Sequence, residues 1–267
     1  LLAVAHAQRY EWRDVQQLVT IEPSGDLIVE DTRTLWTDGD FGEAFICVHL
    51  AQGERIDLLP GSGAGSSGPQ ATAFTQPCAG GTEMVVRNMV RVSERRVRFV
   101  YRLSGAMDFY SDVARWYWNI LEQDHPPVIG YSLRVEAPGP MAEPYDAYVH
   151  RYANPERPVV TLSEDRSVLT VEFEQVPPGA SVEINYLMDP ALFERRGTSP
   201  GLEAALREEL EILERSEAMA GRAALRRSPW WALLPGGVVA FLALGVLTAY
   251  LKHGREPKVM AMRYPFE

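Results

Sequence analysis

Two aspartates in one aromatic-rich segment have the spacing of paired acids. Asp108 and Asp112 lie four residues apart at the start of segment 108–121. The spacing of Tyr110 and Tyr117 predicts a short crossover helix for this segment. Residues four apart share one face of a helix, where two carboxylates can act as general acid and base. The alternative, which we favour, is that they cap the helix or form hydrogen bonds with the neighbouring tryptophans and tyrosines.

The same segment carries a group of aromatic side chains, namely Tyr110, Trp116, Tyr117 and Trp118. Such a group can form a platform for a sugar or for the edge of another protein, with Tyr117 and Trp118 as the interaction residues. The alternative is packing in the core or at a domain interface, which is the commoner use of aromatic side chains.

Other motifs give no catalytic or cofactor site. Residues 63–68 match G-x-G-x-x-G, but they run into Pro69 instead of opening a helix, so we expect a flexible loop. A metal site built from His49 and His150 is one hypothesis, and two hydrogen-bonded strand histidines are the alternative. The sequence contains no G-x-S-x-G, C-x-x-C or H-E-x-x-H motif. We therefore predict that the protein is not an enzyme and binds no cofactor or metal.

Cys47 and Cys78 are the only cysteines. In an oxidising compartment they can form a disulfide, but two unpaired, half-buried cysteines behave as small apolar residues. Both alternatives remain open from the sequence.

Period-two alternation runs from Gln8 to about Pro190 and predicts a mostly β fold. Leu27, Val29, Asp31, Arg33 and Leu35 fall on one face of a predicted strand. Residues 95–103 show the clearest alternation, and further strands are expected at 45–50, 84–92, 128–137, 147–152, 168–173 and 182–187. This many short strands favour an Ig-like β-sandwich. We expect two β-domains, 8–122 with the crossover helix and 123–192, or alternatively one larger sandwich.

An amphipathic helix is predicted for residues 199–227, with Ser199 as its N-cap and Pro200 at its first position. Its apolar stripe contains Leu202, Leu206, Leu210 and Leu213. We expect a stalk or lateral brace that joins the β-domain to a membrane, or alternatively a helix packed on its own domain.

Residues 230–251 form an uncharged run long enough to cross a bilayer as one helix. They predict a single transmembrane helix, followed by a cytoplasmic tail at 252–267. Small residues recur at four-residue spacing, which lets another transmembrane helix approach closely. The candidate helix-contact residues are Gly236, Ala240, Gly245 and Ala249.

The N-terminal residues indicate on which side of the membrane the β-domain lies. Residues 1–7 are typical of the end of a signal peptide, with Ala5 and Ala7 as an A-x-A cleavage site. This predicts a single-pass protein of the bacterial inner membrane whose main domain is periplasmic or otherwise extracytoplasmic.

Composition limits the partners. A formal charge of −10 and the absence of a basic stripe leave no electrostatic footprint for nucleic acid. The expected partners are the lipid bilayer and other transmembrane helices or subunits.

A set of spaced residues resembles the signature of the YciQ-like family of predicted bacterial membrane proteins. The signature residues are Phe99, Tyr101, Leu103, Gly105, Ala106, Tyr110, Asp112, Ala114, Tyr117, Trp118, Asn119, Pro127, Val128 and Ile129. The resemblance covers residues 10–267 and implies a signal peptide, an extracytoplasmic β-domain, a charged helix and a membrane span. It implies no activity and no catalytic residue.

These features favour a non-catalytic accessory or structural subunit, which docks on a membrane complex through its span and its β-domain. The alternative is a ligand-binding or sensory module of the cell envelope that uses the aromatic residues near 110–118.

Overall fold

The computed structural model describes residues 9–38, 43–64, 72–87 and 93–227, together with Leu244 and Thr248. The chain divides into two compact units, Leu1–Arg222 and Ala223–Glu267. The β-strands of the described residues lie in the first unit.

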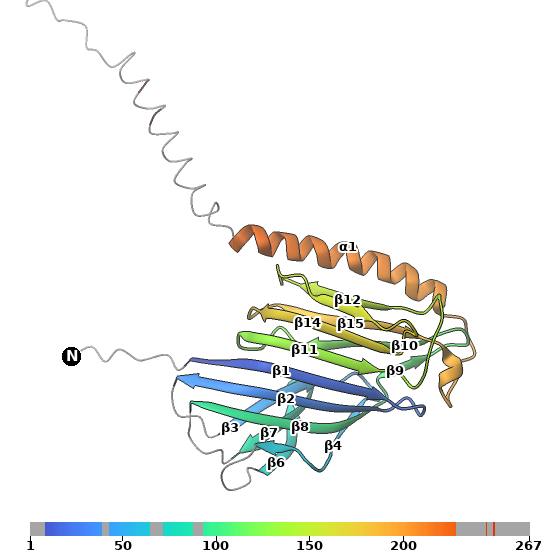
Figure 1. Cartoon of the computed structure of the whole chain (residues 1–267), viewed down its shortest axis with the longest axis horizontal. Coiled ribbons are helices and arrows are strands. Elements are labelled where there is room, and N and C mark those ends of the chain that lie inside the picture. Colours follow the sequence, from blue (N-terminus) through green and yellow to red (C-terminus); the bar gives the residue numbers. More distant parts are fainter. Residues whose placement is uncertain are drawn as a thin grey trace, which may run out of the picture. The chain divides into compact units, whose positions relative to one another are not determined.

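The largest sheet has eight strands (Figure 1). Its strands, in spatial order, are β13 (Val159–Leu162), β14 (Val168–Val176), β11 (Val128–Glu136), β1 (Arg9–Ile21), β2 (Leu27–Asp38), β8 (Glu94–Ser104) and β4 (Arg55–Leu58), and β5 (Gly63–Ala64) also pairs with β8. Neighbouring strands are antiparallel except β1 and β11, which are parallel. Strands that are far apart in the sequence therefore meet at the centre of this sheet.

Two smaller sheets complete the β-structure of the described residues. The four-stranded sheet has the order β12 (Ala147–Tyr152), β15 (Ser181–Met188), β10 (Ala114–Leu121) and β9 (Met107–Phe109). The three-stranded sheet has the order β3 (Glu43–His49), β7 (Gly81–Arg87) and β6 (Thr72–Cys78).

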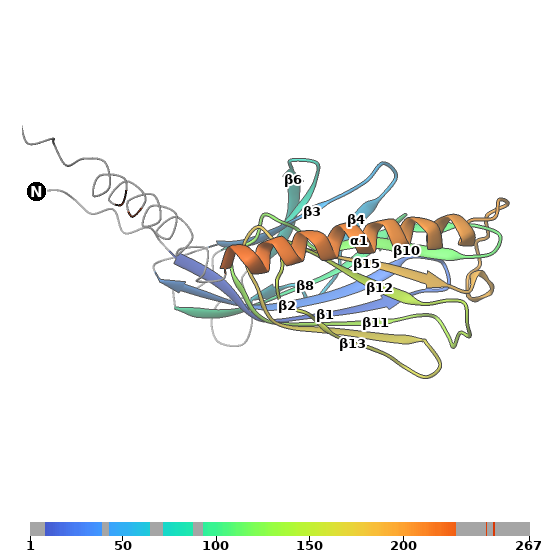
Figure 2. The same cartoon turned by 90° about the horizontal axis from the view of Figure 1, so that it is seen from above.

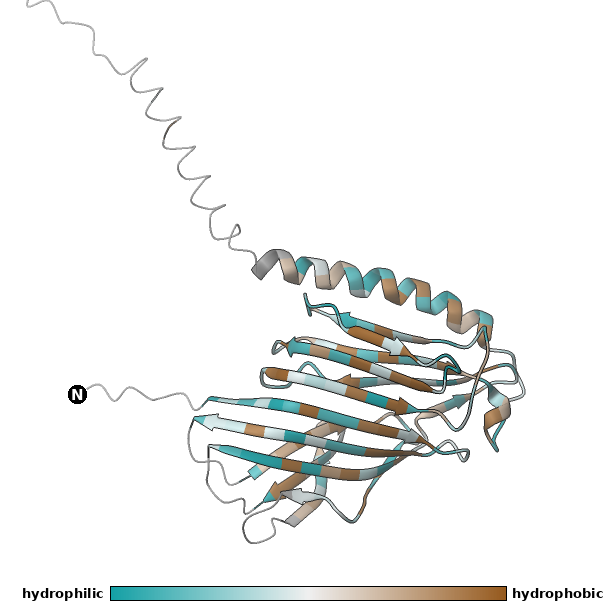
Figure 3. Ribbon diagram, viewed as in Figure 1, coloured by the Kyte–Doolittle hydropathy of each residue, from teal (hydrophilic) through white to brown (hydrophobic). Residues whose placement is uncertain are grey.

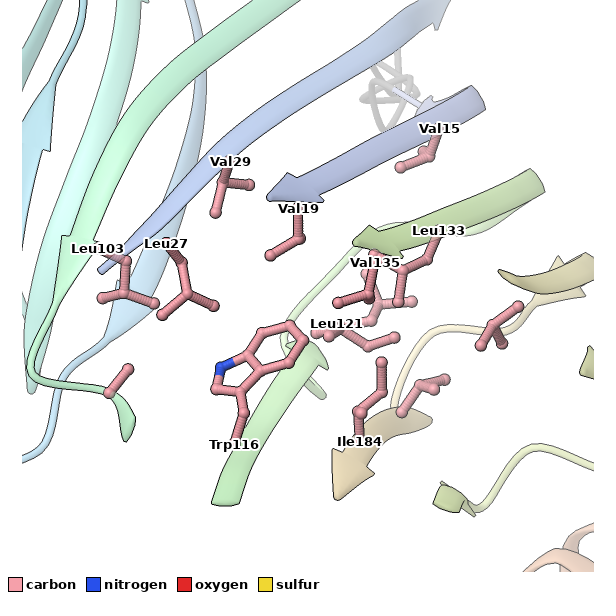
Figure 4. Packing of buried hydrophobic residues seen from close by; sticks show 14 of the residues in the cluster. Val15, Val19, Leu27, Val29, Leu103, Trp116, Leu121, Leu133, Val135 and Ile184 are labelled. Carbon is pink, nitrogen blue, oxygen red and sulfur yellow. The ribbon is translucent and has the colours of Figure 1, made fainter. Parts of the chain in front are cut away.

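One hydrophobic core joins all three sheets. Apolar and polar residues alternate along β1, β2 and β8, so one face of the large sheet is apolar (Figure 3). Val19 and Leu27 from the large sheet pack with Trp116 and Ile184 from the four-stranded sheet (Figure 4). Ile46 of β3 belongs to the same cluster. Each fully buried aliphatic side chain contributes about 1.5–3 kcal/mol.

The mostly β prediction is confirmed, but the arrangement does not support its Ig-like part. An Ig-like sandwich consists of two antiparallel sheets. Here one large sheet with a parallel pair faces two smaller ones. Strand β1 from the predicted first domain pairs directly with β11 from the predicted second domain, so residues on both sides of Glu122 build the same sheet.

The helix predicted at 108–121 is wrong. These residues form β9 and β10, with a turn between them, and β10 pairs with β9 on one side and β15 on the other. Aromatic residues favour strands when neighbouring strands and a core receive them. Side chains 116 and 118 therefore share one face, and 117 lies on the other.

The α-helix among the described residues is α1 (Leu202–Arg227), which lies along the four-stranded sheet (Figure 2). Its buried residues are Ala205, Glu209, Ile212, Ser216 and Ala220. The predicted apolar stripe is packed only at its start, where Leu202 and Leu206 are partly buried against a small apolar cluster. Leu210 and Leu213 are 67% and 43% exposed.

Within the ranges that the structure describes, no helix is both long and apolar enough to cross a membrane. The predicted signal-peptide residues 1–7 and tail 252–267 lie outside these ranges, as does the predicted span 230–251 apart from Leu244 and Thr248. Gly236, Ala240, Gly245 and Ala249 are likewise not described.

Candidate functional site

A cavity of about 440 Å³ lies between the large sheet, strand β3 and strand β10. Most of its lining is apolar or aromatic. The lining includes Trp12, Val19, Val29, Leu35, Ala44, Ile46, Val48, Leu103, Trp116, Trp118, Ile120 and Leu121. Strands β1, β2 and β8 supply the floor through their inward-facing residues, and β3 and β10 supply the opposite wall.

Charged residues lie in this floor. The Arg33 Nε donates to Asp31 Oδ1 at 2.8 Å, and its Nη2 donates to Oδ2 at 2.7 Å. Gln17 also donates to Asp31 Oδ2, at 2.7 Å, and receives a hydrogen bond from the Tyr131 hydroxyl. All four side chains belong to buried residues. The guanidinium also lies 5.5 Å from the Trp12 ring centroid.

The floor carries no net charge, because Asp31 and Arg33 neutralise each other. Burial opposes the charged form of Arg33, but Asp31 outweighs burial and the pKa of Arg33 is raised. Burial, and then the charge of Asp31, also raises the pKa of Tyr101 and of Tyr131 well above the ordinary value. Both tyrosines therefore stay neutral hydrogen-bonding groups at physiological pH.

Two polar atoms of β10 residues that line the cavity have no hydrogen-bond partner among the described residues. They are the indole nitrogen of Trp116 and the amide oxygen of Asn119, whose amide nitrogen donates to Glu122 at 2.8 Å. A buried polar atom without a partner costs about 1–3 kcal/mol. Figure 4 shows the Trp116 ring extending from β10 toward Val19 and Leu27.

Partly exposed groups mark the rim of the cavity. His49 Nδ1 lies 3.2 Å from Glu122 Oε1. Burial lowers the pKa of His125, which also lines the cavity. Cys47 and Cys78 form a disulfide with a Cα–Cα distance of 6.3 Å, and both residues line the cavity. The disulfide ties strand β3 to strand β6 beside the site.

The aromatic residues of 110–118 do not form a cluster. Trp116 and Trp118 face the cavity, whereas the Tyr117 hydroxyl donates to Glu183 on the other face of the sheet. Arg115 lies 5.0 Å from the Tyr117 ring centroid. The period of two along β10 is the reason, because it sends adjacent side chains to opposite faces.

The paired aspartates do not form an acid pair either. Asp112 Oδ1 accepts hydrogen bonds from the backbone nitrogens of Gly201 and Leu202, at 2.7 and 3.2 Å. It therefore caps the N-terminus of α1, where Ser199 was the predicted cap. Asp108 is exposed on β9, opposite Arg115 in the strand register.

The structure also separates the two histidines of the hypothetical metal site. His49 lies at the cavity rim, whereas His150 Nε2 contacts both carboxylate oxygens of Glu209, at 3.0 and 3.3 Å, beneath α1. Among the described residues, no three His, Cys, Asp or Glu side chains are grouped so that they could hold a metal ion.

A polar interface beneath α1 was missed from the sequence. Asn185 donates to Glu209 at 2.7 Å, Arg115 Nη1 lies 2.7 Å from Glu208, and Arg151 forms an ion pair with Glu217 at 2.8 Å. One feature of the sequence could have revealed this interface: Glu209 and Ser216 fall on the same helical face as Ala205 and Ile212.

The three sheets therefore enclose a ligand-sized, mainly apolar cavity in the part of the chain that the structure describes. The chain belongs to the family described as predicted membrane protein (DUF2207) N-terminal domain, whose model matches residues 12–188. This match confirms the expectation of a family of predicted membrane proteins of unknown function. It does not confirm the YciQ-like name. No curated protein matches the chain.

Several solved structures show a distant likeness to this chain. A putative protease from Parabacteroides distasonis ATCC 8503 is 13% identical, with a TM-score of 0.44 over 67% of this chain and 40% of that one. Leukotriene A4 hydrolase from Saccharomyces cerevisiae is 8% identical, with a TM-score of 0.42 over 66% of this chain and 29% of that one. An M1 zinc metallopeptidase from Deinococcus radiodurans is 14% identical, with a TM-score of 0.35 over 66% and 42%. The chain thus spans less than half of each, and likeness at this level carries no argument about function.

Proposed function

We propose that this chain is a non-catalytic, membrane-anchored binding protein whose β-domain holds a small, mainly apolar molecule in its cavity. The observation that carries the proposal is the cavity of about 440 Å³ with the Asp31–Arg33 ion pair in its floor. Its volume lies within the roughly 300–1,000 Å³ typical of small-molecule sites, which are mainly apolar with a few polar groups.

Folding alone does not account for the ion pair. Replacing a buried ion pair by apolar residues of similar volume is often neutral or stabilising. Asp31 and Arg33 lie between Val29 and Leu35 on the same face of β2. Apolar residues at these two positions would have made the floor of the cavity fully apolar. Breaks in an otherwise consistent pattern are expected at functional sites.

The proposed location is the bacterial inner membrane, with the β-domain outside the cytoplasm. The family and the apolar run 230–251 support attachment to a membrane. Residues 1–7 support export, and the Cys47–Cys78 disulfide agrees with an oxidising compartment.

Binding of a fluorescent apolar probe tests the proposed function. The full chain is held in an amphipathic polymer, which avoids small detergents that could enter the cavity, and is titrated with N-phenyl-1-naphthylamine. The matched control is Ala44→Trp, which fills the cavity from β3. We expect saturable, stoichiometric fluorescence in the natural chain and none beyond the polymer blank in the variant. Equal probe fluorescence from the two folded proteins would contradict the proposed function.

A second candidate function, the accessory subunit, is favoured by the exposed edge of the large sheet. Strand β13 is the last strand of this sheet, and its residues Val159 and Val160 are 63% and 44% exposed. An exposed apolar edge strand can accept a strand from a partner protein. Gly236, Ala240, Gly245 and Ala249 would add a helix contact within the membrane.

Native purification tests this second function. We expect the full chain, extracted in mild detergent, to migrate with a stoichiometric partner that Val160→Lys weakens at least ten-fold. Purification as a monomer only would count against the subunit function and leave the binding function standing.

A further inference from the structure

We propose that β13 pairs with β13 of a second copy of this chain, in antiparallel orientation, so that two large sheets join edge to edge. This inference rests on the second candidate function and commits the exposed edge to one occupant. It does not depend on the cavity.

The edge is open on both faces of the sheet. No strand of the described residues lies beyond β13, which runs along the margin of the fold (Figure 2). Val160 lies opposite Val171 on the inner face, but Val160 is 44% exposed whereas Val171 is fully buried. Val159, on the outer face, is 63% exposed. One more strand would cover Val160 and continue the apolar inner face of the sheet.

The hydrogen bonds of β13 decide which of its residues can bond to a further strand. The Ser163 nitrogen donates to the Val168 oxygen at 2.9 Å, which continues the register of β13 with β14. Hydrogen-bonded pairs alternate along an antiparallel ladder, so every second residue of β13 bonds to β14. Val160 and Leu162 therefore direct their N–H and C=O groups to the free edge.

One register of two identical edges uses both of these residues. With Thr161 on the two-fold axis, Val160 of each copy lies opposite Leu162 of the other, and each pair exchanges both of its N–H···O bonds. With Val160 on the axis, Leu162 would lie opposite Pro158, which has no N–H. With Leu162 on the axis, Val160 would lie opposite Glu164, in the turn after the strand. The pairing is therefore centred on Thr161.

Charge complementarity favours the same register. It brings Arg157 of each copy to the turn of the other copy that carries Glu164 and Asp165. The Arg157 side chain is 82% exposed, and its ion-pair partner Glu217 lies at 3.9 Å. The carboxylate of Asp165 accepts two hydroxyl hydrogen bonds within its own turn and stays exposed. Opposite charges thus meet at both ends of the paired strands, where they set register and orientation more than affinity.

The length of the strand sets the strength of the dimer. Strand β13 has four residues, so the paired edges cover a small area and association in dilute solution should be weak. Two copies that are anchored in one membrane meet at a higher effective concentration, which favours the pair. The test is therefore made in the cells that produce the full chain.

Cross-linking at the two-fold axis tests the pairing. Cys47 and Cys78 are joined to each other, so Thr161→Cys adds a thiol whose two copies face each other. Opposed residues of this kind have Cα atoms about 4.5 Å apart, within the range of a disulfide. The cells are treated with diamide, and the cross-linked peptide is identified by mass spectrometry.

Val159→Cys is the matched control. It lies on the same face of the same strand and is 63% exposed, but its two copies would lie about 13 Å apart along the paired strands. We expect the disulfide-linked dimer to form at least ten-fold faster with Thr161→Cys. Random collision would cross-link the two variants at similar rates.

Two further changes, each added to Thr161→Cys, test the backbone and the charges. Val160→Pro removes an N–H that faces the free edge, a position where an edge strand tolerates proline, and should slow cross-linking at least ten-fold. Arg157→Glu replaces an 82% exposed side chain, so the fold should not change. It sets like charges against the acidic turn and should slow cross-linking at least three-fold, which decides the matter if Val160→Pro does not fold.

The outcomes separate this inference from both functions proposed above. No dimer from Thr161→Cys, equal rates for Thr161→Cys and Val159→Cys, or unchanged rates with the two further changes would overturn the self-pairing. A cross-link from Thr161→Cys to a different protein would also overturn it, but would leave the accessory-subunit function standing. Probe binding in the cavity is measured separately and is unaffected by any of these results.

Discussion

The ion pair of Asp31 and Arg33 is the residue-scale feature on which the site depends. Strand β2 places both side chains on the inner face of the large sheet, between apolar neighbours. Since Arg33 is the cation paired with the buried Asp31 carboxylate, neither charge can be lost alone without a large cost.

Asp31→Asn should therefore lower the free energy of unfolding by about 3 kcal/mol, because it leaves the Arg33 charge buried without a counter-charge. The control is Asp57→Asn, which breaks the exposed pair with Arg55 and should cost less than about 1 kcal/mol. Guanidinium denaturation of both variants measures the difference. Similar losses would contradict the buried position of the pair.

Tyrosine titration tests the polar floor by pH. Burial raises the pKa of Tyr101 and Tyr131 in the folded protein above the ordinary value of about 10. Their contribution to stability is present below pH 10 and is lost as the pH rises toward the folded pKa values. We expect tyrosinate absorbance to rise later in the folded chain than in guanidinium, and Tyr131→Phe to reduce the alkaline loss of stability. Identical tyrosinate titration curves for the folded and the guanidinium-unfolded chain would contradict the raised pKa of the two tyrosines.

At the scale of elements, strand β10 shows why part of the fold was not predictable. Strands β2 and β8 were visible because one face of each alternates clearly with the other. Strand β10 is covered by the core on one face and partly by α1 on the other, so most of its residues are apolar or aromatic. A strand buried on both faces loses its alternation and resembles a helix.

The packing of α1 has a similar explanation. Its apolar stripe is packed only at Leu202 and Leu206. Further along the helix, the sheet offers His150 and Asn185, which favour Glu209 on the buried face. Asp31 and Arg33 were visible on the apolar face of their strand, whereas nothing in the sequence shows that β3 and β10 enclose a cavity above them. The cavity depends on contacts between strands that are far apart in the sequence, and a local sequence pattern does not reveal these contacts.

The cap of α1 makes an element-scale prediction. Asp112→Ala should lower stability by about 1 kcal/mol, because it removes the acceptor for two backbone nitrogens of the first turn. Ser199→Ala is the matched control and should change stability by less than about 0.5 kcal/mol. Thermal unfolding compares them, and a larger loss at Ser199 would restore the cap expected from the sequence.

At the scale of the whole molecule, one core and one large sheet hold residues from both ends of the β-domain together. The parallel pairing of β1 with β11 joins the two halves of the large sheet. The disulfide between β3 and β6 links two segments that line the cavity. The family places such a domain in a predicted membrane protein. A mainly apolar cavity with a disulfide in its wall suits a molecule that is poorly soluble in water.

The most direct test is to identify what the natural protein carries. The full chain and its Ala44→Trp variant are purified from membranes under the same conditions, and the small molecules released on denaturation are compared by mass spectrometry. The account predicts a small, mainly apolar compound in stoichiometric amount from the natural chain and its absence from the variant. The same compounds in equal amounts from both proteins would contradict it.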